Sequence, residues 1–408
     1  DAALLAALPK APSKYNPYRF PDVGKFRRNL VLQNLKDNNF ISNGELEKFK
    51  NSSLNLKKRK IEIVNEANSY TEEVRRIVKE KYGFEKLYSQ GLSIRTPLNI
   101  NYQIEAIKSL RKGIEDYDRR HGWRGPITNK KKEKNWEDII KRYKLDPTLN
   151  WQFAEVINLN NSKLEFKILS NKQKEIVGVL SYQDIKWTLP KSKLVSDRFK
   201  LGDIILVKKE NNSWNLKQYP KVNGGIVVID PFSGNIKALV GGFNFKTSEF
   251  NRVTQAKRQP GSAFKPIVYA AALEGGFSPN SIILDAPFVE SQGVGLKKWK
   301  PENYGKKFYG LSTLRKGIEK SRNLMTVRIA QTVGFDKISK ISKDLGIYKN
   351  VPELLSVSLG SNETTLLKLT NAYCIFINGG KKVKPILISR IQDRRGKTIY
   401  NAEKRNCK

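Results

Sequence analysis

The sequence predicts a multidomain α+β protein, because three hydrophobic patterns follow one another along its 408 residues. Apolar residues recur at helical spacing through most of the first 120 positions. Short runs with period-two alternation follow from about 150 to 220, and mixed strand and helix patterns continue from 222 to the end. At roughly 100–200 residues per domain, a chain of this length holds two or three domains.

The N-terminal region is predicted to be helical. Helical patterning covers 2–8 and 26–49, and the four prolines of 8–22 predict an extended connector between them. Ser42 is placed to cap a helix, and Glu45 three residues later completes the pattern of a capping box.

A second group of elements precedes residue 136. The pattern predicts a helix over 72–83 that ends at a glycine, a strand over 92–99 and a helix over 102–120. A turn is expected at 121–126 and a solvated basic loop at 129–135.

The middle of the chain predicts a small antiparallel β module of about five strands. Its clearest runs are "FAEVINL", "KLEFKIL", "EIVGVLS" and "DIILVKK", separated by Asn, Lys and Gly turns. Nothing in these runs is typical of catalysis, so the module is interpreted as a spacer or a protein-docking platform. From 222 the character changes again, with a predicted hairpin over 223–242 and a long Ala-rich helix starting near Ser262.

The chain is strongly basic, with 76 Lys and Arg against 39 Asp and Glu and a net charge of +37. Such a balance raises nucleic acid or an anionic membrane surface as partners. The basic residues are spread along the whole sequence, however, and no nucleic-acid-binding module is recognisable. Compositional bias is therefore the preferred interpretation, and no nucleic-acid partner is expected.

Few residues are available for metal binding or histidine-based catalysis. The chain has one histidine, His121, and two cysteines, Cys374 and Cys407, without metal-ligand spacing. This leaves little for a His-based metal site or a Ser-His-Asp triad, so any acyl transfer must use a base other than histidine. His121 is interpreted as structural and Cys374 as a core residue, while the sequence leaves a pairing of Cys374 with Cys407 open.

A serine and a lysine one helical turn apart form the main catalytic candidate. S-x-x-K occurs at Ser109–Lys112, in the middle of a charged helix, and at Ser262–Lys265. The turn "QPG" precedes the second copy and the apolar run "PIVYAAAL" follows it, which puts Ser262 in the first helical turn and Lys265 in partly apolar surroundings. Desolvation lowers the pKa of an amine toward the range of a general base. A capping serine with a snorkelling lysine is the structural alternative.

A third polar group is expected to complete such a site, and S-x-N is its usual form. The pattern starts at five serines: Ser53, Ser213, Ser233, Ser278 and Ser321. Four of them read as loop, turn or capping positions. Ser321 and Asn323 differ, because they lie between two predicted helices at the start of an apolar one.

Taken together, these segments resemble the class A bifunctional penicillin-binding proteins, most closely the 1A type, and the resemblance covers essentially the whole chain. "RQPGSAFKPIVYAAALEGG" is similar to the nucleophile segment of the family, and "KSRNLMT" to its S-x-N motif. "KKWKPENYGKKFYG" resembles the segment between them, and "YDRRHGWRGP" is typical of the 1A type. "LAALPKAPSKYNPYR" and "RRNLVL" resemble the end of a glycosyltransferase domain.

The resemblance implies four regions. Residues 1–50 correspond to the C-terminal end of a glycosyltransferase domain, and 51–145 to a linker region with a strand and helices. Residues 146–221 correspond to an OB-like β module, and 222–408 to a penicillin-binding, β-lactamase-like transpeptidase domain.

The implied reaction is D,D-transpeptidation of peptidoglycan stem peptides. By resemblance, Ser262 is the acylated nucleophile, Lys265 its general base and Ser321 the group that passes the proton to the leaving amine. Asn323 is implied to hydrogen-bond the donor peptide. β-Lactams would acylate the same serine, and no cofactor is implied.

Two departures from the family pattern stand out. The third motif, K-[TS]-G, is absent, since "GKT" at 396–398 has a different order and reads as a hairpin turn. The motif is expected beyond residue 408, so crosslinking by this chain alone is expected to be impaired. The catalytic glutamate motif of the glycosyltransferase and the membrane anchor are expected before residue 1, because the apolar stretch 2–8 is too short to span a bilayer.

The resemblance also implies a location and partners. The complete protein would lie at the periplasmic face of the bacterial inner membrane. It would act on stem peptides and lipid-linked precursor strands, with cell-wall elongation proteins and outer-membrane activators as possible partners.

The alternatives fall into two classes. A D,D-carboxypeptidase or a serine β-lactamase shares the Ser–Lys pair, but neither accounts for the glycosyltransferase-like N-terminal segment. A non-catalytic, basic cell-wall-binding scaffold, or a nucleic-acid binder, would use Ser262 only as a helix cap.

Overall fold

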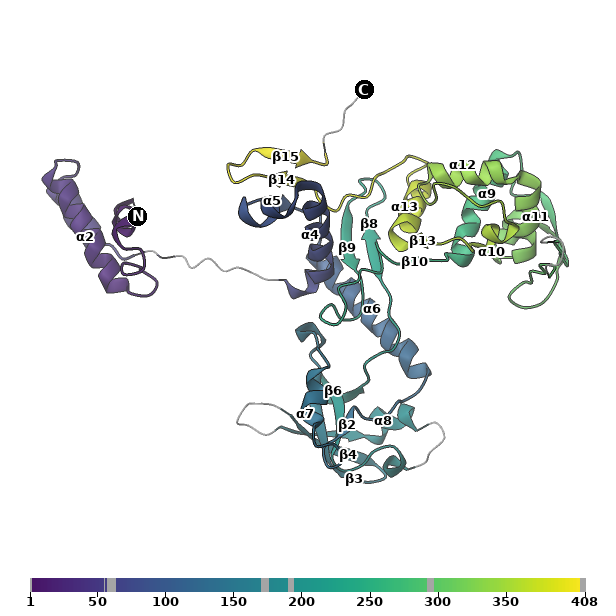
Figure 1. Ribbon diagram of the computed structural model, residues 1–408, viewed down its shortest axis with the longest axis horizontal. Coiled ribbons are helices and arrows are strands. Elements are labelled where there is room, and N and C mark those ends of the chain that lie inside the picture. Colours follow the sequence, from purple (N-terminus) through teal and green to yellow (C-terminus); the bar gives the residue numbers. More distant parts are fainter. Residues whose placement is uncertain are drawn as a thin grey trace. The chain divides into compact units, whose positions relative to one another are not determined.

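The structure is a computed structural model that describes residues 2–54, 56, 64–169, 176–189, 194–291 and 297–403. The chain divides into two compact units, Asp1–Ile63 and Val64–Lys408 (Figure 1). Cys407 lies outside the described residues.

The first unit is helical, as predicted. It contains α1 (Ala2–Ala7), the short 3₁₀ turn Leu8–Lys10, α2 (Pro21–Asp37) and α3 (Asn43–Asn51). The predicted capping box is confirmed at Ser42, whose backbone N–H donates to Glu45 Oε2 at 2.9 Å while its Oγ accepts from the Glu45 N–H at 3.3 Å. The helix α2 begins earlier than the periodicity indicates, because Pro21 suits the first helical turn.

The second unit opens with helices and a short strand. These are the 3₁₀ turn Asn65–Ala67, α4 (Asn68–Tyr82), α5 (Phe84–Ser89), β1 (Ser93–Arg95) and α6 (Ile100–Arg120). Gly83 ends α4 with φ at +84°, as its position in the sequence predicts. The predicted helix over 102–120 is confirmed, and the predicted strand over 92–99 shortens to β1, which pairs with β14 (Arg390–Gln392).

Helix α6 contacts two different sheets through polar side chains, one of them buried and one half-buried. Near its start, Gln103 is fully buried, donates to the Leu239 carbonyl at 3.0 Å and accepts from the Leu239 N–H at 2.8 Å. Near its end, Glu115 accepts from Lys217 Nζ at 2.8 Å. Leu239 lies in β9 (Ile236–Val240) and Lys217 in β7 (Ser213–Lys217), so α6 links the β module to the C-terminal domain.

The β module is built on an antiparallel sheet. In the described part of the chain the sheet has six strands, with order β2-β6-β3-β4-β5 and with β7 paired to β6. Its strands are β2 (Thr128–Asn129), β3 (Gln152–Leu159), β4 (Lys163–Ile168), β5 (Val177–Ser181), β6 (Asp203–Glu210) and β7 (Ser213–Lys217). The five-strand prediction is confirmed, and β2 adds a strand from outside the predicted range.

Short helices and turns complete the module: α7 (Trp136–Lys141), α8 (Tyr182–Ile185) and the 3₁₀ turns Pro147–Leu149, Lys186–Thr188 and Val195–Asp197. One face of the sheet is packed with apolar side chains, Phe166 of β4 among them. The predicted basic loop at 129–135 is mostly exposed after Asn129.

The C-terminal domain mixes strands and helices, as predicted. The hairpin expected over 223–242 is formed by β8 (Ile226–Ile229) and β9 (Ile236–Val240). The other strands are β10 (Lys257–Arg258), which pairs with β13 (Thr364–Thr365), β11 (Ile282–Asp285), which pairs with β12 (Gly310–Thr313), and β14, which pairs with β15 (Thr398–Asn401). The helices are α9 (Lys265–Glu274), α10 (Leu314–Glu319), α11 (Asn323–Val333), α12 (Phe335–Asp344) and α13 (Leu366–Ile377), with 3₁₀ turns Gly261–Phe264 and Leu355–Leu359.

Helix α9 is the centre of this domain's core and packs against α11 and α12 (Figure 1). Most of its residues are buried, which confirms the prediction from its apolar sequence. The predicted long helix is only ten residues long. Ser262 lies before it in the 3₁₀ turn Gly261–Phe264, and the α-helix begins at Lys265 with Pro266 in its first turn.

The remaining candidates from the sequence have structural roles. His121 follows the last residue of α6, and its Nδ1 lies 2.9 Å from the Tyr117 carbonyl oxygen. Lys112 of the first S-x-x-K is exposed and pairs with Asp116, which confirms a solvated helix face. Cys374 is a free, buried cysteine in α13.

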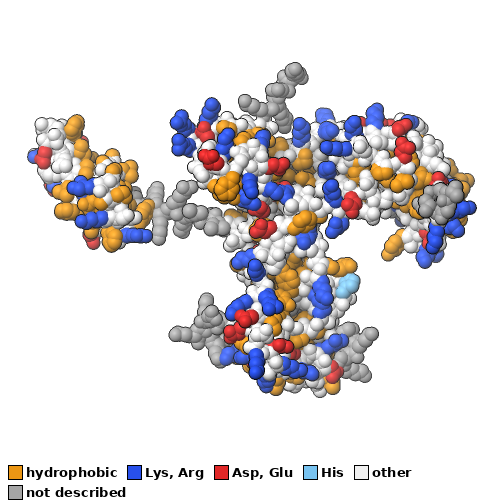
Figure 2. Space-filling model, in the orientation of Figure 1, with side chains coloured by type: hydrophobic (Ala, Val, Ile, Leu, Met, Phe, Trp, Pro, Cys, Tyr) orange, Lys and Arg blue, Asp and Glu red, His pale blue; other side chains and the backbone are white. Residues whose placement is uncertain are grey.

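Lys and Arg side chains are distributed over the face seen in Figure 2, interspersed with acidic ones, instead of forming one patch. Among the described residues, no helix combines the length and hydropathy needed to cross a bilayer. The same residues contain no cluster of three or more His, Cys, Asp or Glu side chains suited to a metal ion.

We expect the β module to be sensitive to one added methyl group. Gly178 of β5 is opposite Phe166 of β4, and a Cβ at this position would meet the Phe166 ring and lie 2.8 Å from Trp214 Nε1. Gly178→Ala should therefore lower the free energy of unfolding by about 1–3 kcal/mol, as overpacking does. Chemical denaturation followed by tryptophan fluorescence measures this change.

Val179→Ala is the matched control, because Val179 is the next residue of β5 and its side chain is exposed. It should change the unfolding free energy by only about 0.5 kcal/mol. Equal unfolding free energies for Gly178→Ala and the unmodified protein would show that the sheet has room at this position.

Candidate active site

Ser262 is an exposed side chain on a tightly held turn. The preceding residue, Gly261, has φ at +56°, and its N–H donates to the Gly360 carbonyl at 3.2 Å. Gly360 itself has φ at +78°, and a Cβ there would collide with the backbone of Gly261. The two glycines therefore allow a close backbone approach that a larger residue at 360 would prevent.

Two aromatic residues hold the rest of this turn. The Tyr373 hydroxyl donates to the Ala263 carbonyl at 2.8 Å. Phe264 is fully buried, with its ring centroid 5.5 Å from that of Tyr348. The segment that carries Ser262 is thus fixed by residues about a hundred positions later in the sequence.

Lys265 is the first residue of α9 and only 1% of its surface is exposed. Its Nζ donates to the Ser321 carbonyl at 2.6 Å, to Asn323 Oδ1 at 2.6 Å and to Ser321 Oγ at 3.0 Å. The structure therefore brings Lys265, Ser321 and Asn323 into one hydrogen-bonded cluster. Among the hydrogen bonds of the described residues, none joins Ser262 to Lys265.

Burial changes the chemistry of this amine. Desolvation lowers the pKa of Lys265 from 10.5 to about 8, in the direction that its apolar surroundings predict. A lysine with this pKa is partly neutral near physiological pH and is able to accept a proton.

The loop that carries the S-x-N motif is short and strained. Ser321 lies between α10 and α11 with φ at +51°, a left-handed conformation that costs a non-glycine residue about 1–2 kcal/mol. Its N–H donates to the Ile318 carbonyl at 3.0 Å, and that of Arg322 to the Gly317 carbonyl at 2.9 Å. These bonds complete the end of α10 and hold the strained residue with its carbonyl toward Lys265.

The other S-x-N serines do not share this arrangement. Ser53 follows α3, Ser213 begins β7 and Ser233 lies in the turn between β8 and β9. Ser278 begins a turn, and its N–H donates to Ser281 Oγ at 2.9 Å. The interpretation of these four as loop, turn or capping positions is consistent with their places in the fold.

Sequence reasoning missed the residues that support Asn323. Its side-chain amide donates to the Glu302 carbonyl at 2.7 Å, and its backbone N–H donates to Asn303 Oδ1 at 2.8 Å. Asn303 in turn donates to Asp285 Oδ1 at 2.8 Å. Spacing alone gives no signal for these contacts, because they join segments 18 to 21 residues apart through a loop.

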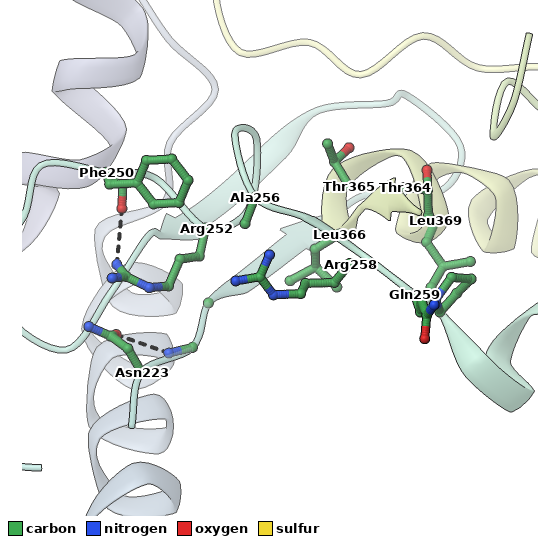
Figure 3. A pocket seen from close by; sticks show the side chains of 13 residues that line it. Asn223, Phe250, Arg252, Ala256, Arg258, Gln259, Thr364, Thr365, Leu366 and Leu369 are labelled. Carbon is green, nitrogen blue, oxygen red and sulfur yellow. Dashed lines mark hydrogen bonds between the residues drawn. The ribbon is translucent and has the colours of Figure 1, made fainter. Parts of the chain in front are cut away.

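A pocket lies directly before the turn that carries Ser262 (Figure 3). Gln259 and Pro260 line it together with Arg252 and Arg258. Burial, followed by the charge of Arg258, lowers the pKa of Arg252. The two guanidinium groups in its lining make the pocket positively charged, although none of the four predicted site residues lines it.

The "GKT" stretch is part of a hairpin, as predicted. Gly396 has φ at +81° in the turn between β14 and β15, and Thr398 is the first residue of β15. Lys397 contributes its carbonyl, which accepts from the Asp393 N–H at 3.0 Å. This hairpin pairs with β1 instead of joining the cluster around Lys265.

Comparison with known families matches two segments of the chain. Residues 224–407 match the penicillin binding protein transpeptidase domain, and residues 123–222 match the penicillin-binding protein OB-like domain. The second match includes β2 and the turn before it, ahead of the expected boundary at residue 146.

Relatives align along nearly the whole chain. Penicillin-binding protein 1A of Rickettsia felis is 41% identical over 100% of this chain and 51% of its own length. That of Neisseria gonorrhoeae is 32% identical over 97% of this chain and 50% of its own length. The chain thus spans about half the length of the curated relatives it matches.

A solved structure agrees with these relatives. The crystal structure of penicillin-binding protein 1A from Haemophilus influenzae matches with a TM-score of 0.72 and 32% identity, over 98% of this chain and 59% of the other. The expectations of a transpeptidase domain and an OB-like module are confirmed. The chain belongs to the penicillin-binding proteins, and the relatives that align along nearly all of its residues are of the 1A type.

Proposed function

We propose that this chain carries the peptide-crosslinking site of a bifunctional peptidoglycan synthase, with Ser262 as nucleophile and Lys265 as general base. The observation that carries the proposal is the buried amine of Lys265. Lys265 lies one helical turn after the exposed Ser262, and its Nζ is hydrogen-bonded to three oxygen atoms of the S-x-N loop.

The hydrogen bonds of Lys265 suit a base. The Ser321 carbonyl and Asn323 Oδ1 can only accept, so they take the two N–H groups of a neutral amine. Its lone pair is then left for a hydroxyl group. Ser321 Oγ, at 3.0 Å from Nζ, either donates to this lone pair or accepts from the ammonium. This ability to do both supports Ser321 as the proton carrier.

In the first half-reaction the proton of Ser262 passes to the neutral Lys265 amine while Oγ bonds to the carbonyl carbon of the penultimate D-Ala. The C–N bond to the terminal D-Ala then breaks. The leaving nitrogen takes the proton from Lys265 through Ser321, so D-Ala departs with a free amino group and Lys265 returns to its neutral form. The Ser262 N–H supplies one oxyanion donor, a contribution of about 3–4 kcal/mol in related sites.

In the second half-reaction an amine of a neighbouring stem peptide attacks the acyl-enzyme and restores Ser262. A β-lactam would enter the first half-reaction at the same serine and remain attached. The K-[TS]-G motif is not in this sequence, so the group that binds the substrate carboxylate is not assigned to a residue of this chain.

For the complete protein the proposal is broader. It includes glycan polymerisation by a glycosyltransferase domain, of which residues 1–50 form the end, and an anchor in the inner membrane with the catalytic parts in the periplasm. Lipid-linked precursor strands would be the substrate of that domain. Cell-wall elongation proteins and outer-membrane activators would be partners.

The first test is labelling of the full-length protein by a fluorescent penicillin. Labelling should be abolished by Ser262→Ala, because the acyl bond forms at this hydroxyl. Ser109→Ala, in the other S-x-x-K pattern, is the matched control and should label like the unmodified protein. Absence of label on the unmodified protein, or equal labelling of Ser262→Ala, would reject the enzymatic function and favour a scaffold.

The pH dependence of acylation follows from the lowered pKa of Lys265. Because the neutral amine is the active form, the rate should rise with pH and level off above about 8, where the amine is deprotonated. Below this value the rate should fall about tenfold per pH unit. The measurement is the acylation rate between pH 6 and 10 with a penicillin that does not ionise in this range.

Lys265→Arg serves as the control for that profile, since a guanidinium stays protonated at every pH tested. It should acylate too slowly to define a profile. A rate of the unmodified protein that keeps rising to pH 10, as for an ordinary lysine, would contradict a base with a lowered pKa.

A further inference from the structure

Asn303 occupies a buried position beside the S-x-N loop, with 5% of its surface exposed. Its Oδ1 accepts from the Asn323 N–H at 2.8 Å and lies 3.4 Å from the Leu324 nitrogen. These are the first two residues of α11, and the residue before the helix, Arg322, provides no side-chain cap. Asn303 therefore caps α11 from a loop twenty residues earlier.

The orientation of this amide is fixed by its own donors. Asn303 Nδ2 donates to Asp285 Oδ1 at 2.8 Å and to the Lys307 carbonyl at 2.9 Å. With both N–H groups used, the oxygen must face α11. Asp285 is held by the pairing of β11 with β12, where it is opposite Gly310.

The environment of Asp285 is unfavourable for a residue with a purely structural role. It is fully buried, and within the described part of the chain its Oδ2 has no hydrogen-bond partner. Its ion pair with Arg322 is long, at 3.9 Å from Nε, while the Arg322 guanidinium lies 3.3 Å from the centre of the Tyr309 ring. A buried carboxylate with so few hydrogen bonds and only a long ion pair lowers the stability of the fold. Stability therefore does not explain why Asp285 is at this position.

The neighbour of Asn303 acts on the same residue. The Glu302 carbonyl accepts from Asn323 Nδ2 at 2.7 Å. This contact leaves Asn323 Oδ1 toward Lys265 Nζ, at 2.6 Å. Residues 302 and 303 thus hold both the backbone and the side chain of Asn323.

We propose that Asn303, oriented by Asp285, is a positioning residue of the acylation site that aims Asn323 at the Lys265 amine. The inference rests on the proposed function, since it concerns how Lys265 is prepared to accept the proton of Ser262. Asn303 touches neither substrate nor the reacting atoms in this arrangement. It acts through Asn323 and through the start of α11.

The test is acylation of the full-length protein by a fluorescent penicillin, with binding and acylation separated by varying its concentration. Asn303→Ala should lower the acylation rate constant about 10–100-fold, the effect expected for displacement of a catalytic group by about an ångström. The dissociation constant should change less than the acylation rate constant, because the proposed role of Asn303 is to prepare the Lys265 amine for the proton transfer. An acylation rate within about twofold of the unmodified protein would overturn the proposal.

Asn244→Ala is the matched control. Asn244 is also buried, donates to the Lys144 carbonyl at 2.8 Å and accepts from the Lys246 N–H at 3.0 Å. Both variants should lower the melting temperature, but only Asn303→Ala should lower the acylation rate constant. Equal loss of acylation in both variants would reduce the role of Asn303 to general stability and overturn the proposal.

An exchange of the two side chains tests the pairing itself. Asn303→Asp brings two carboxylates together and should lower the acylation rate constant at least about tenfold. Adding Asp285→Asn restores one donor and one acceptor, so the double variant should recover most of this loss. A double variant no faster than Asn303→Asp would overturn the proposal, and this comparison decides the matter if Asn303→Ala does not fold.

The two hypotheses fail in different ways. If the unmodified protein labels at Ser262 and Asn303→Ala labels equally fast, only the positioning role is lost. If Ser262→Ala labels as the unmodified protein does, the proposed function is lost and the positioning role with it.

Discussion

The burial of one amine sets the constraints on the transpeptidase domain. Lys265 begins a helix most of whose residues are buried, so its Nζ is shielded from solvent and needs protein acceptors. Those acceptors come from the loop at 321–323, 56 to 58 residues away. Meeting them requires Ser321 to adopt a left-handed backbone conformation and α11 to begin at Asn323. The geometry of the loop thus follows from the need of the buried Lys265 amine for hydrogen-bond acceptors.

Hydrogen bonds of polar side chains also join other parts of the second unit. Gln103 exchanges two hydrogen bonds with Leu239, and Glu115 pairs with Lys217, so each end of α6 is bonded to a different sheet. Apolar packing alone would allow the helix to slide, because the hydrophobic effect has no direction. Hydrogen-bonded polar pairs add the direction, and they fix where α6 lies on each partner.

Local patterns allowed much of this fold to be predicted. The period of α6, the alternation of the β-module strands and the capping box at Ser42 each depend on neighbouring residues, and each is present in the structure. Features that depend on distant residues could not be predicted. The strand β2 is only two residues long and forms because β6 pairs with it.

The candidate site divides in the same way. The S-x-x-K and S-x-N spacings and the resemblance to a family pointed to Lys265 and the loop at 321–323, which the structure brings together. Asn303 caps α11 from a separate segment, and no periodic pattern in the sequence indicates this contact. The tight contact of Gly261 with Gly360 also made the turn before Lys265 a 3₁₀ turn, where periodicity predicted a continuous helix.

The long-range contacts of the Ser262 turn have a consequence for the order of assembly. The turn is held by Gly360 and Tyr373, about a hundred residues after the serine, and these contacts are absent until that part of the chain has been made. Contacts of high sequence separation form late, because the loop between them must first close. A growing chain therefore carries the complete "SAFK" sequence before Ser262 is positioned, so the proposed acylation of this serine requires that the domain has already closed around it.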